Sequence, residues 1–166
     1  MTSMHPTTFT TSDSPLGRIL LVATPLGIRG LWFTSGQRNA PDPAAWRRDD
    51  DHPVLAEATV QLADYFSCQR STFDLPLDLS AGTPFQQSVW RALRNIPFGR
   101  TITYGDLADR IGQPRAVRAA AAAIGRNPIG IIIPCHRVVG ANGALTGYAG
   151  GLERKSALLQ LEASSA

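Results

Sequence analysis

Residues 104–125, YGDLADRIGQPRAVRAAAAAIG, contain two short helical stretches on either side of a glycine turn. The pattern predicts one helix over residues 104–111 and a second over residues 114–124, with Gly112 and Gln113 as the turn between them. A helix, a glycine-containing turn and a second helix form the helix-turn-helix pattern. Many ordinary helix pairs share it, so its meaning depends on the surrounding sequence.

The second helix is rich in alanine, with six alanines between residues 114 and 123. Alanine strongly favours a helix and leaves almost no side chain on its surface. Close packing against neighbouring helices would explain the run. A helix that enters a narrow groove is the alternative, and the residues alone leave both interpretations open.

The sequence around this pair predicts further helices. Residues 83–86, TPFQ, combine an N-cap threonine, a proline at the first helical position and a glutamine three residues after the cap. The apolar run at residues 129–133 predicts a buried strand that ends beside Cys135, and a last helix is expected from Leu152. The buried stripe of the first of these helices is expected to contain Phe85, Val89, Trp90 and Leu93.

The first half of the chain carries mainly β patterns. Residues 18–23 and 28–33 are rich in β-forming residues around a turn with proline and glycine, which predicts a hairpin. Residues 35–51 predict a loop, and the alternation in residues 73–79 predicts an edge strand. Residues 53–66 predict a helix that buries Leu55, Thr59, Leu62 and Phe66.

Together these patterns predict an α+β protein with two lobes. Residues 1–80 are expected to form a small antiparallel β-sheet lobe with one helix. Residues 83–166 are expected to form a mostly helical lobe with the helix-turn-helix, after a linker at residues 80–82.

Composition limits the classes of function. The 166 residues contain no apolar run of the roughly 18 residues that a membrane span needs. The first residues, MTSMHPTTFTT, lack the basic and apolar regions of a secretion signal, so we expect a cytoplasmic protein. Two cysteines, Cys68 and Cys135, and the scattered His5, His52 and His136 have no zinc-site spacing, so we expect two reduced thiols and no metal.

Charge is distributed unevenly between the two halves. Residues 1–80 carry six arginines and nine acidic residues, or −3, whereas residues 81–166 carry ten basic and four acidic residues, or +6. A basic half suggests a polyanionic partner such as nucleic acid. An ordinary solvated surface would show the same charge.

Cys135 stands next to His136 and Arg137 in the stretch IPCHRVVG, residues 133–140. An unperturbed thiol has a pKa near 8.5, so a reactive cysteine needs a base or a positive neighbour. Neighbouring side chains on an extended chain point to opposite sides, so His136 is not expected to contact the thiol directly. A buried structural cysteine is the alternative.

This stretch closely resembles the O6-alkylguanine-DNA alkyltransferase family. The resemblance spans about residues 83–162 and includes FQQ at 85–87, YG at 104–105, PRAVRA at 114–119, GRNP at 125–128, and LTGYAGG at 145–151. It implies a ribonuclease H-like N-terminal lobe and a winged-helix-like DNA-binding lobe. It also implies a monomeric, cofactor-free, single-turnover repair enzyme whose cysteine takes the alkyl group from O6-alkylguanine, and from O4-alkylthymine, in double-stranded DNA.

The resemblance also implies catalytic roles. Cys135 would attack the alkyl carbon, and His136 would act through a bridging water. Glu162 would orient His136, and Asn127 would brace the turn before the active site. Tyr104 would crowd the target phosphate and donate a proton or hydrogen bond to the departing base.

DNA contacts follow from the same resemblance. Arg118 would enter the duplex and fill the space of the flipped base, while the small alanines allow close approach to the minor groove, independently of sequence. The expected DNA contacts are Tyr104, Gly105, Gln113, Arg118, Ala119, Ala120 and Ala141, the last in a wing at residues 141–143. The base pocket is expected to be formed by Val138, Tyr148, Ala149 and Gly150, with alanine at 149 where some relatives carry serine.

Three other functions compete with this one. A non-catalytic sensor of alkylated DNA would lack the cysteine, which is present as Cys135. A cysteine hydrolase would use the Cys-His pair for acyl transfer but leaves the alanine-rich helix unexplained. A transcription factor would need polar, base-reading side chains on that helix.

Overall fold

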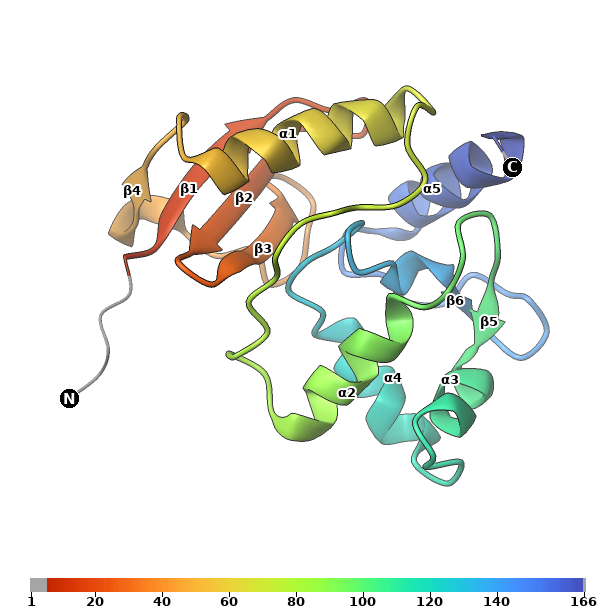
Figure 1. Ribbon diagram of the computed structural model, residues 1–166. Helices are drawn as coiled ribbons and strands as arrows, with labels where there is room; N and C mark the ends of the chain where they lie inside the picture. The colour runs from red at the N-terminus through yellow and green to blue at the C-terminus, as the bar shows by residue number, and fades with distance from the viewer. Residues whose placement is uncertain (1–5, 166) are drawn as a thin grey trace. The chain divides into compact units, whose positions relative to one another are not determined.

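The computed structural model describes residues 6–165, and the chain divides into two compact units, Met1–Leu79 and Ser80–Ala166 (Figure 1). His5 lies outside the described residues. Across residues 6–165, no helix combines the length and the apolar character needed to cross a membrane.

The N-terminal unit is built on a four-stranded sheet. The strands lie in the order β3-β2-β1-β4. β1 pairs antiparallel with β2, and β2 with β3, whereas β4 pairs parallel with β1. Their bounds are Thr8–Ser12 for β1, Ile19–Thr24 for β2, Gly27–Phe33 for β3 and Arg47–Arg48 for β4.

The predicted hairpin is therefore confirmed, but the prediction of an antiparallel sheet is wrong for β4, which pairs parallel with β1. The chain leaves β3 at one edge and returns beside β1 at the other edge, through a long connection that contains the 3-10 turn η1, Pro43–Ala45. A parallel pair cannot be joined by a tight turn, so it needs such a connection. β4 consists of only two residues, both exposed, which are too few to give a periodic sequence pattern within the predicted loop.

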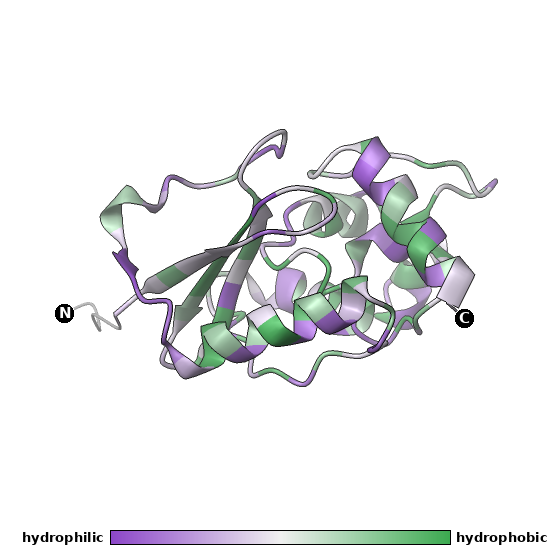
Figure 2. Ribbon diagram, turned by 90° about the horizontal axis from the view of Figure 1, so that it is seen from above, coloured by the Kyte–Doolittle hydropathy of each residue, from purple (hydrophilic) through white to green (hydrophobic). Residues whose placement is uncertain are grey.

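Helix α1, Pro53–Phe66, has the predicted bounds and lies against β1, β2 and β3 (Figure 1). All six residues of β2 are buried, and hydrophobic segments alternate with more polar ones along the strands of this unit (Figure 2). The buried face of α1 is turned slightly from the predicted stripe, since Thr59 and Phe66 are only half-buried. Its buried residues are Leu55, Ala58, Gln61, Leu62 and Tyr65.

Residues 73–79 do not form the predicted edge strand. They make one parallel bridge, between Leu77 and Ile28, with the Ile28 amide donating to the Pro76 carbonyl at 2.8 Å. Pro76 has no amide hydrogen to extend this ladder. A side chain on Gly27 would lie 2.3 Å from the Pro76 oxygen, so the close approach requires glycine there.

The C-terminal unit is mostly helical and contains one short parallel ladder. β5 pairs with β6, so that Ile102 lies opposite Val138. The predicted cap of α2 is confirmed, because the side chains of Thr83 and Gln86 each bond the backbone of the other residue. The elements are α2 at Pro84–Leu93, β5 at Ile102–Thr103, α3 at Tyr104–Arg110, α4 at Val117–Gly125, η2 at Cys135–Arg137, β6 at Val138–Val139 and α5 at Leu152–Ser165.

Helices α2, α3 and α4 pack against one another. Val89, Trp90 and Leu93 are buried as predicted, whereas Phe85 is half-buried. The indole nitrogen of Trp90 donates to the Ala123 carbonyl at 2.9 Å, which ties α2 to the end of α4.

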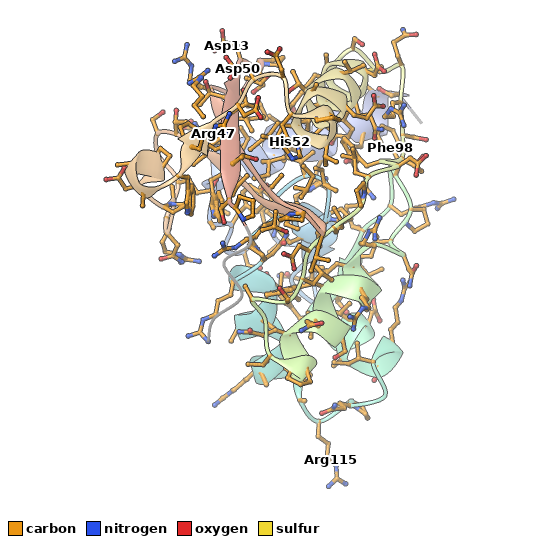
Figure 3. All side chains as sticks on the ribbon, turned by 60° about the vertical axis from the view of Figure 1, so that its left-hand side comes forward. Asp13, Arg47, Asp50, His52, Phe98 and Arg115 are labelled. Atoms are coloured by element: carbon orange, nitrogen blue, oxygen red, sulfur yellow. The ribbon has the colours of Figure 1, made fainter. Side chains whose placement is uncertain are left out.

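The helix-turn-helix is present with a longer turn than predicted. Gly112 has a φ of +72°, and the Gln113 amide bonds back to the Ala108 carbonyl at 2.9 Å, which ends α3 in the manner of a Schellman cap. A second turn follows, closed by the Ala116 amide on the Gln113 carbonyl, so α4 begins at Val117 and not at residue 114. Arg115 extends outward from this turn (Figure 3).

Candidate active site

Residues 129–133 form a tight buried turn, where the sequence predicts a strand. The Ile133 amide donates to the Ile129 carbonyl at 3.0 Å, and Ile131 has a φ of +66°. The left-handed region is unfavourable for a β-branched residue, so surrounding contacts must hold this conformation. An apolar run of five residues does not distinguish a buried strand from a buried turn.

Asn127 holds this turn closed at both ends. Its side-chain amide donates to the Ile133 carbonyl at 2.8 Å, and its side-chain oxygen accepts from the Ile129 amide at 3.0 Å. Asn127 is buried, so water does not compete for these bonds. The bracing role expected for Asn127 is thus supported by its contacts.

Cys135 follows this turn and begins the 3-10 helix η2. The Arg137 amide bonds to the Pro134 carbonyl at 3.0 Å, so Cys135 and His136 lie on a helical turn and not on an extended chain. Cys135 is half-exposed, while the next four residues are buried. Burial raises the pKa of the Cys135 thiol, and the Asn127 side chain and the Lys155 charge act in the opposite direction.

His136, Arg137 and Glu162 form a buried network. The Glu162 Oε2 atom lies 2.7 Å from His136 Nε2, and its Oε1 atom accepts from Arg137 Nε at 2.8 Å. Arg137 Nη2 donates to Glu162 Oε2 at 3.0 Å, which makes the ion pair bidentate. Glu162 is 1% exposed, so this carboxylate is held almost without water.

This network fixes the hydrogen on the imidazole. A carboxylate only accepts, so His136 Nε2 carries the hydrogen and Nδ1 has a lone pair. Nδ1 is buried and has no hydrogen-bond partner among residues 6–165. Burial lowers the pKa of His136 despite Glu162, so the ring is neutral and Nδ1 can accept a proton.

Lys155 is a site residue that the sequence analysis does not identify. It is fully buried on α5, and its Nζ donates to the carbonyls of Val138 and Thr146, each at 2.7 Å. Burial lowers its pKa, and the negative charge of an ionised Cys135 acts to raise it. The available signal was spacing, because Lys155, Leu158 and Glu162 share one helix face.

The parallel ladder places the start of α3, at Tyr104, next to the strand that follows Cys135. It opens α3 directly after β5, and β5 lies beside β6, which follows η2. The Thr103 and Asp106 side chains cap this helix start reciprocally. The Tyr104 hydroxyl accepts a hydrogen bond from Thr146 Oγ1 at 3.0 Å.

The residues expected to form the base pocket lie on β6 and the following loop. Val138 and Gly150 are buried, and Tyr148 and Ala149 are half-buried. Burial, with the charge of an ionised Cys135 as a smaller cause, raises the pKa of Tyr148 well above its usual value, so its phenol remains protonated. The loop turns back through a bond from the Gly140 amide to the Ala144 carbonyl, and Ala141 is exposed near its tip.

The predicted DNA-contact residues divide by exposure. Gln113, Arg118, Ala119 and Ala141 are exposed, and Tyr104 and Gly105 are half-exposed. Ala120 is fully buried, so its side chain offers no surface to DNA, and its expected DNA contact is corrected to a packing role. The alanine run therefore has one face that packs and one face that is exposed.

No group of three or more His, Cys, Asp or Glu side chains that could hold a metal ion occurs within residues 6–165.

Comparisons with known proteins agree across both units. Residues 7–79 match the family model described as "6-O-methylguanine DNA methyltransferase, ribonuclease-like domain", and residues 84–164 match its "DNA binding domain". A methylated-DNA–protein-cysteine methyltransferase of Methanosarcina acetivorans is 47% identical over 92% of this chain and 96% of its own length. The Mycobacterium tuberculosis protein of that name is also 47% identical, over 95% and 93% of the two chains.

A solved structure is similar in fold as well. The crystal structure of Mycobacterium tuberculosis OGT in complex with DNA has a TM-score of 0.86 and 46% identity, and the match covers 96% of this chain and 94% of that one. The predicted α+β architecture with a DNA-binding helical lobe is confirmed. The chain therefore belongs to the family of methylated-DNA–protein-cysteine methyltransferases.

Proposed function

We propose that this protein repairs O6-alkylguanine in double-stranded DNA by moving the alkyl group to Cys135 in a single turnover. One observation carries the assignment of the acceptor. His136 has a buried Nδ1 with no hydrogen-bond partner within residues 6–165, on the same 3-10 turn as a half-exposed cysteine, while Glu162 holds the opposite ring nitrogen.

In the proposed reaction, the Cys135 proton moves to His136 Nδ1 through a bridging water. The thiolate attacks the alkyl carbon, a carbon–sulfur bond forms and the bond from carbon to the guanine oxygen breaks. The departing guanine takes a hydrogen bond or a proton from Tyr104. A thioether has no easy route back to a thiolate, so each molecule acts once and needs no cofactor.

The buried charges favour the thiolate formed in this transfer, whereas the charged imidazole is opposed by burial and by Arg137 and Lys155 and is favoured by Glu162. With a neutral thiol, Arg137 and Lys155 carry two positive charges against the single negative charge of Glu162. Ionisation of Cys135 adds a second negative charge close to Lys155, and each group favours the charged form of the other. Opposite charges in a low-dielectric site stabilise each other strongly.

For DNA, we propose sequence-independent binding through the minor groove. Arg118 would fill the space of the flipped nucleotide, and the exposed Ala119 would permit the helix to approach closely. Flipping costs a few kcal/mol, less for a poorly paired alkylated base, which favours damaged sites. Backbone amides near Gln113, Gly105 and Ala141 would hold phosphates.

The base pocket would be formed by Val138, Tyr148, Ala149 and Gly150. Alanine at position 149 removes a hydroxyl that some relatives have, and we expect this to change the range of accepted alkyl groups and not the reaction. Acceptance of O4-alkylthymine, the monomeric state and the cytoplasmic location stay predictions.

An intact-mass experiment tests the acceptor. After incubation with duplex DNA containing O6-methylguanine, we expect the mass of one added methylene, located at Cys135 by peptide mapping and absent in Cys135→Ser. Cys68→Ser is the matched control and should still gain the mass, because Cys68 is exposed at the end of α1. DNA binding without any mass gain by the wild type would favour the sensor function.

A second measurement tests base flipping. Arg118→Ala should lose affinity and repair while its thiol still reacts with a small disulfide reagent. Arg91→Ala removes the same charge from an exposed position on α2 and should repair normally. Equal repair by both variants would contradict the role of Arg118.

A further inference from the structure

Thr146 makes a side-chain contact that none of the roles above uses. Its Oγ1 atom donates to the Tyr104 hydroxyl at 3.0 Å, across 42 positions of sequence. Thr146 lies on the loop between β6 and α5, and Tyr104 is the first residue of α3. The contact therefore joins the active-site loop to the start of the helix-turn-helix.

Both partners of this contact are anchored to the same short ladder. The Thr146 carbonyl accepts from Lys155 Nζ at 2.7 Å, and the same ammonium binds the Val138 carbonyl at 2.7 Å. Val138 pairs with Ile102, two residues before Tyr104. Since Lys155 is fully buried, it holds the backbone of Thr146 at a fixed distance from the strand that leads to Tyr104.

The direction of the hydrogen bond matters for chemistry. Each hydroxyl carries one hydrogen, so when the phenol gives its hydrogen to another partner, its oxygen accepts from Thr146. Hydrogen bonds in series polarise each other, so the accepted bond makes the phenol a better donor. We propose that Thr146 is a positioning residue, which orients and polarises Tyr104 as the donor to the departing base.

This inference rests on the donor role proposed for Tyr104. As the carbon–oxygen bond breaks, the guanine gains negative charge and takes the Tyr104 hydrogen bond or proton. Any negative charge that develops on the phenol oxygen is then stabilised by the Thr146 hydroxyl, which keeps its own hydrogen. If the proton is transferred completely, solvent returns one to Tyr104 after the base departs.

Exposure predicts when the contact matters. Thr146 is exposed and Tyr104 half-exposed in the protein without DNA, so water competes for both hydroxyls. Loss of the bond should therefore leave folding stability almost unchanged. Bound DNA would cover both hydroxyls and exclude that water, so the loss should appear in the rate of transfer.

The test uses single-turnover repair of duplex DNA containing O6-methylguanine, in a Cys68→Ser background. Thr146→Val keeps the shape without the hydroxyl and should slow repair roughly 3- to 10-fold, the range for one net hydrogen bond. Thr146→Ser should recover most of the rate. All variants should react at the wild-type rate with a small aromatic disulfide, since that reaction releases no guanine. Thr101→Val, an exposed threonine of the same unit, is the control and should repair normally.

A double-mutant cycle separates positioning from a general effect on the loop. In a Tyr104→Phe background, Thr146→Val should cause no further loss, because Thr146 acts through the missing hydroxyl. A wild-type rate for Thr146→Val, or multiplied losses in the double variant, would overturn the inference. If Tyr104→Phe itself repairs at the wild-type rate, the proposed role of Tyr104 fails, which is a distinguishable result.

Discussion

Replacing Glu162 by glutamine preserves the shape of this side chain and removes its charge from the buried network. The carboxylate accepts from His136 Nε2 at 2.7 Å, from Arg137 Nε and Nη2 at 2.8 and 3.0 Å, and from the Gly99 amide at 3.4 Å. A glutamine amide has one acceptor oxygen and one NH₂ group. Its NH₂ group must therefore face either His136 Nε2 or Arg137, which both donate hydrogen bonds to the carboxylate in the wild type.

The stability cost follows from Arg137. Removing one partner of a buried ion pair costs roughly 3–5 kcal/mol, because the remaining charge stays buried. In the variant, Arg137 keeps its hydrogen bond to the Ile96 carbonyl at 2.7 Å and can still donate to the glutamine oxygen. We therefore expect the lower end of this cost, about 3 kcal/mol. For a chain of this length, that corresponds to a fall in Tm of about 6–12 °C.

The effect on transfer follows from the imidazole. If the amide oxygen stays with Arg137, the NH₂ group donates to His136 Nε2, and the ring hydrogen moves to Nδ1. Nδ1 then has no lone pair to accept the thiol proton. A wrong histidine tautomer costs about 10⁴ in rate in serine proteases, and since a thiol is more acidic than a hydroxyl we expect a loss of at least about 10²-fold here.

The assay combines thermal denaturation with single-turnover methyl transfer, measured at least 15 °C below the Tm of the variant. Glu153→Gln is the matched control, because Glu153 is exposed in the first turn of the same helix. It should change neither Tm nor rate. A Glu162→Gln protein that is folded at the assay temperature and transfers methyl at the wild-type rate would refute both the tautomer assignment and the relay.

Three further predictions concern the turn, the alanine helix and pH. Asn127→Ala loses two buried hydrogen bonds and should lower the free energy of unfolding by roughly 2–4 kcal/mol. The control Asn95→Ala changes an exposed asparagine and should leave it unchanged. Equal Tm values for the two variants would contradict the role of Asn127 in holding residues 129–133. Ala120→Leu should destabilise the protein by roughly 1–3 kcal/mol, because the larger side chain overpacks a buried position. Ala119→Leu, at an exposed position, should keep the wild-type Tm and lose DNA affinity. The reverse pattern would contradict the assignment of a buried and a DNA-facing side to α4. Burial lowers the pKa of His136 in the folded protein, so the unfolded chain binds more protons below about pH 6.5. The free energy of unfolding should therefore fall as the pH drops from about 7.5 to 5.5. Denaturant titrations should show a smaller fall for His136→Gln than for the wild type.

Local signals in the sequence predicted several elements closely. Helix α1 has the predicted bounds, and the Thr83–Gln86 capping box forms as expected, because caps and helical periodicity involve residues within a few positions of each other. Predictions failed where a short segment depended on distant partners. Residues 73–79 form one bridge, and residues 129–133 form a turn held by Asn127.

The sequence by itself determined the family resemblance and the residues proposed for the reaction, since Cys135 and His136 are adjacent in a specific motif. Only the tertiary structure decided the state of those residues. Glu162 lies 26 positions from His136, and burial of this pair sets which ring nitrogen is available. In the sequence, Lys155 has the pattern of an ordinary exposed cation, and only the folded structure shows that it is buried. Burial and long-range hydrogen bonds change the pKa and orientation of a side chain, and both arise from contacts that chain order does not contain.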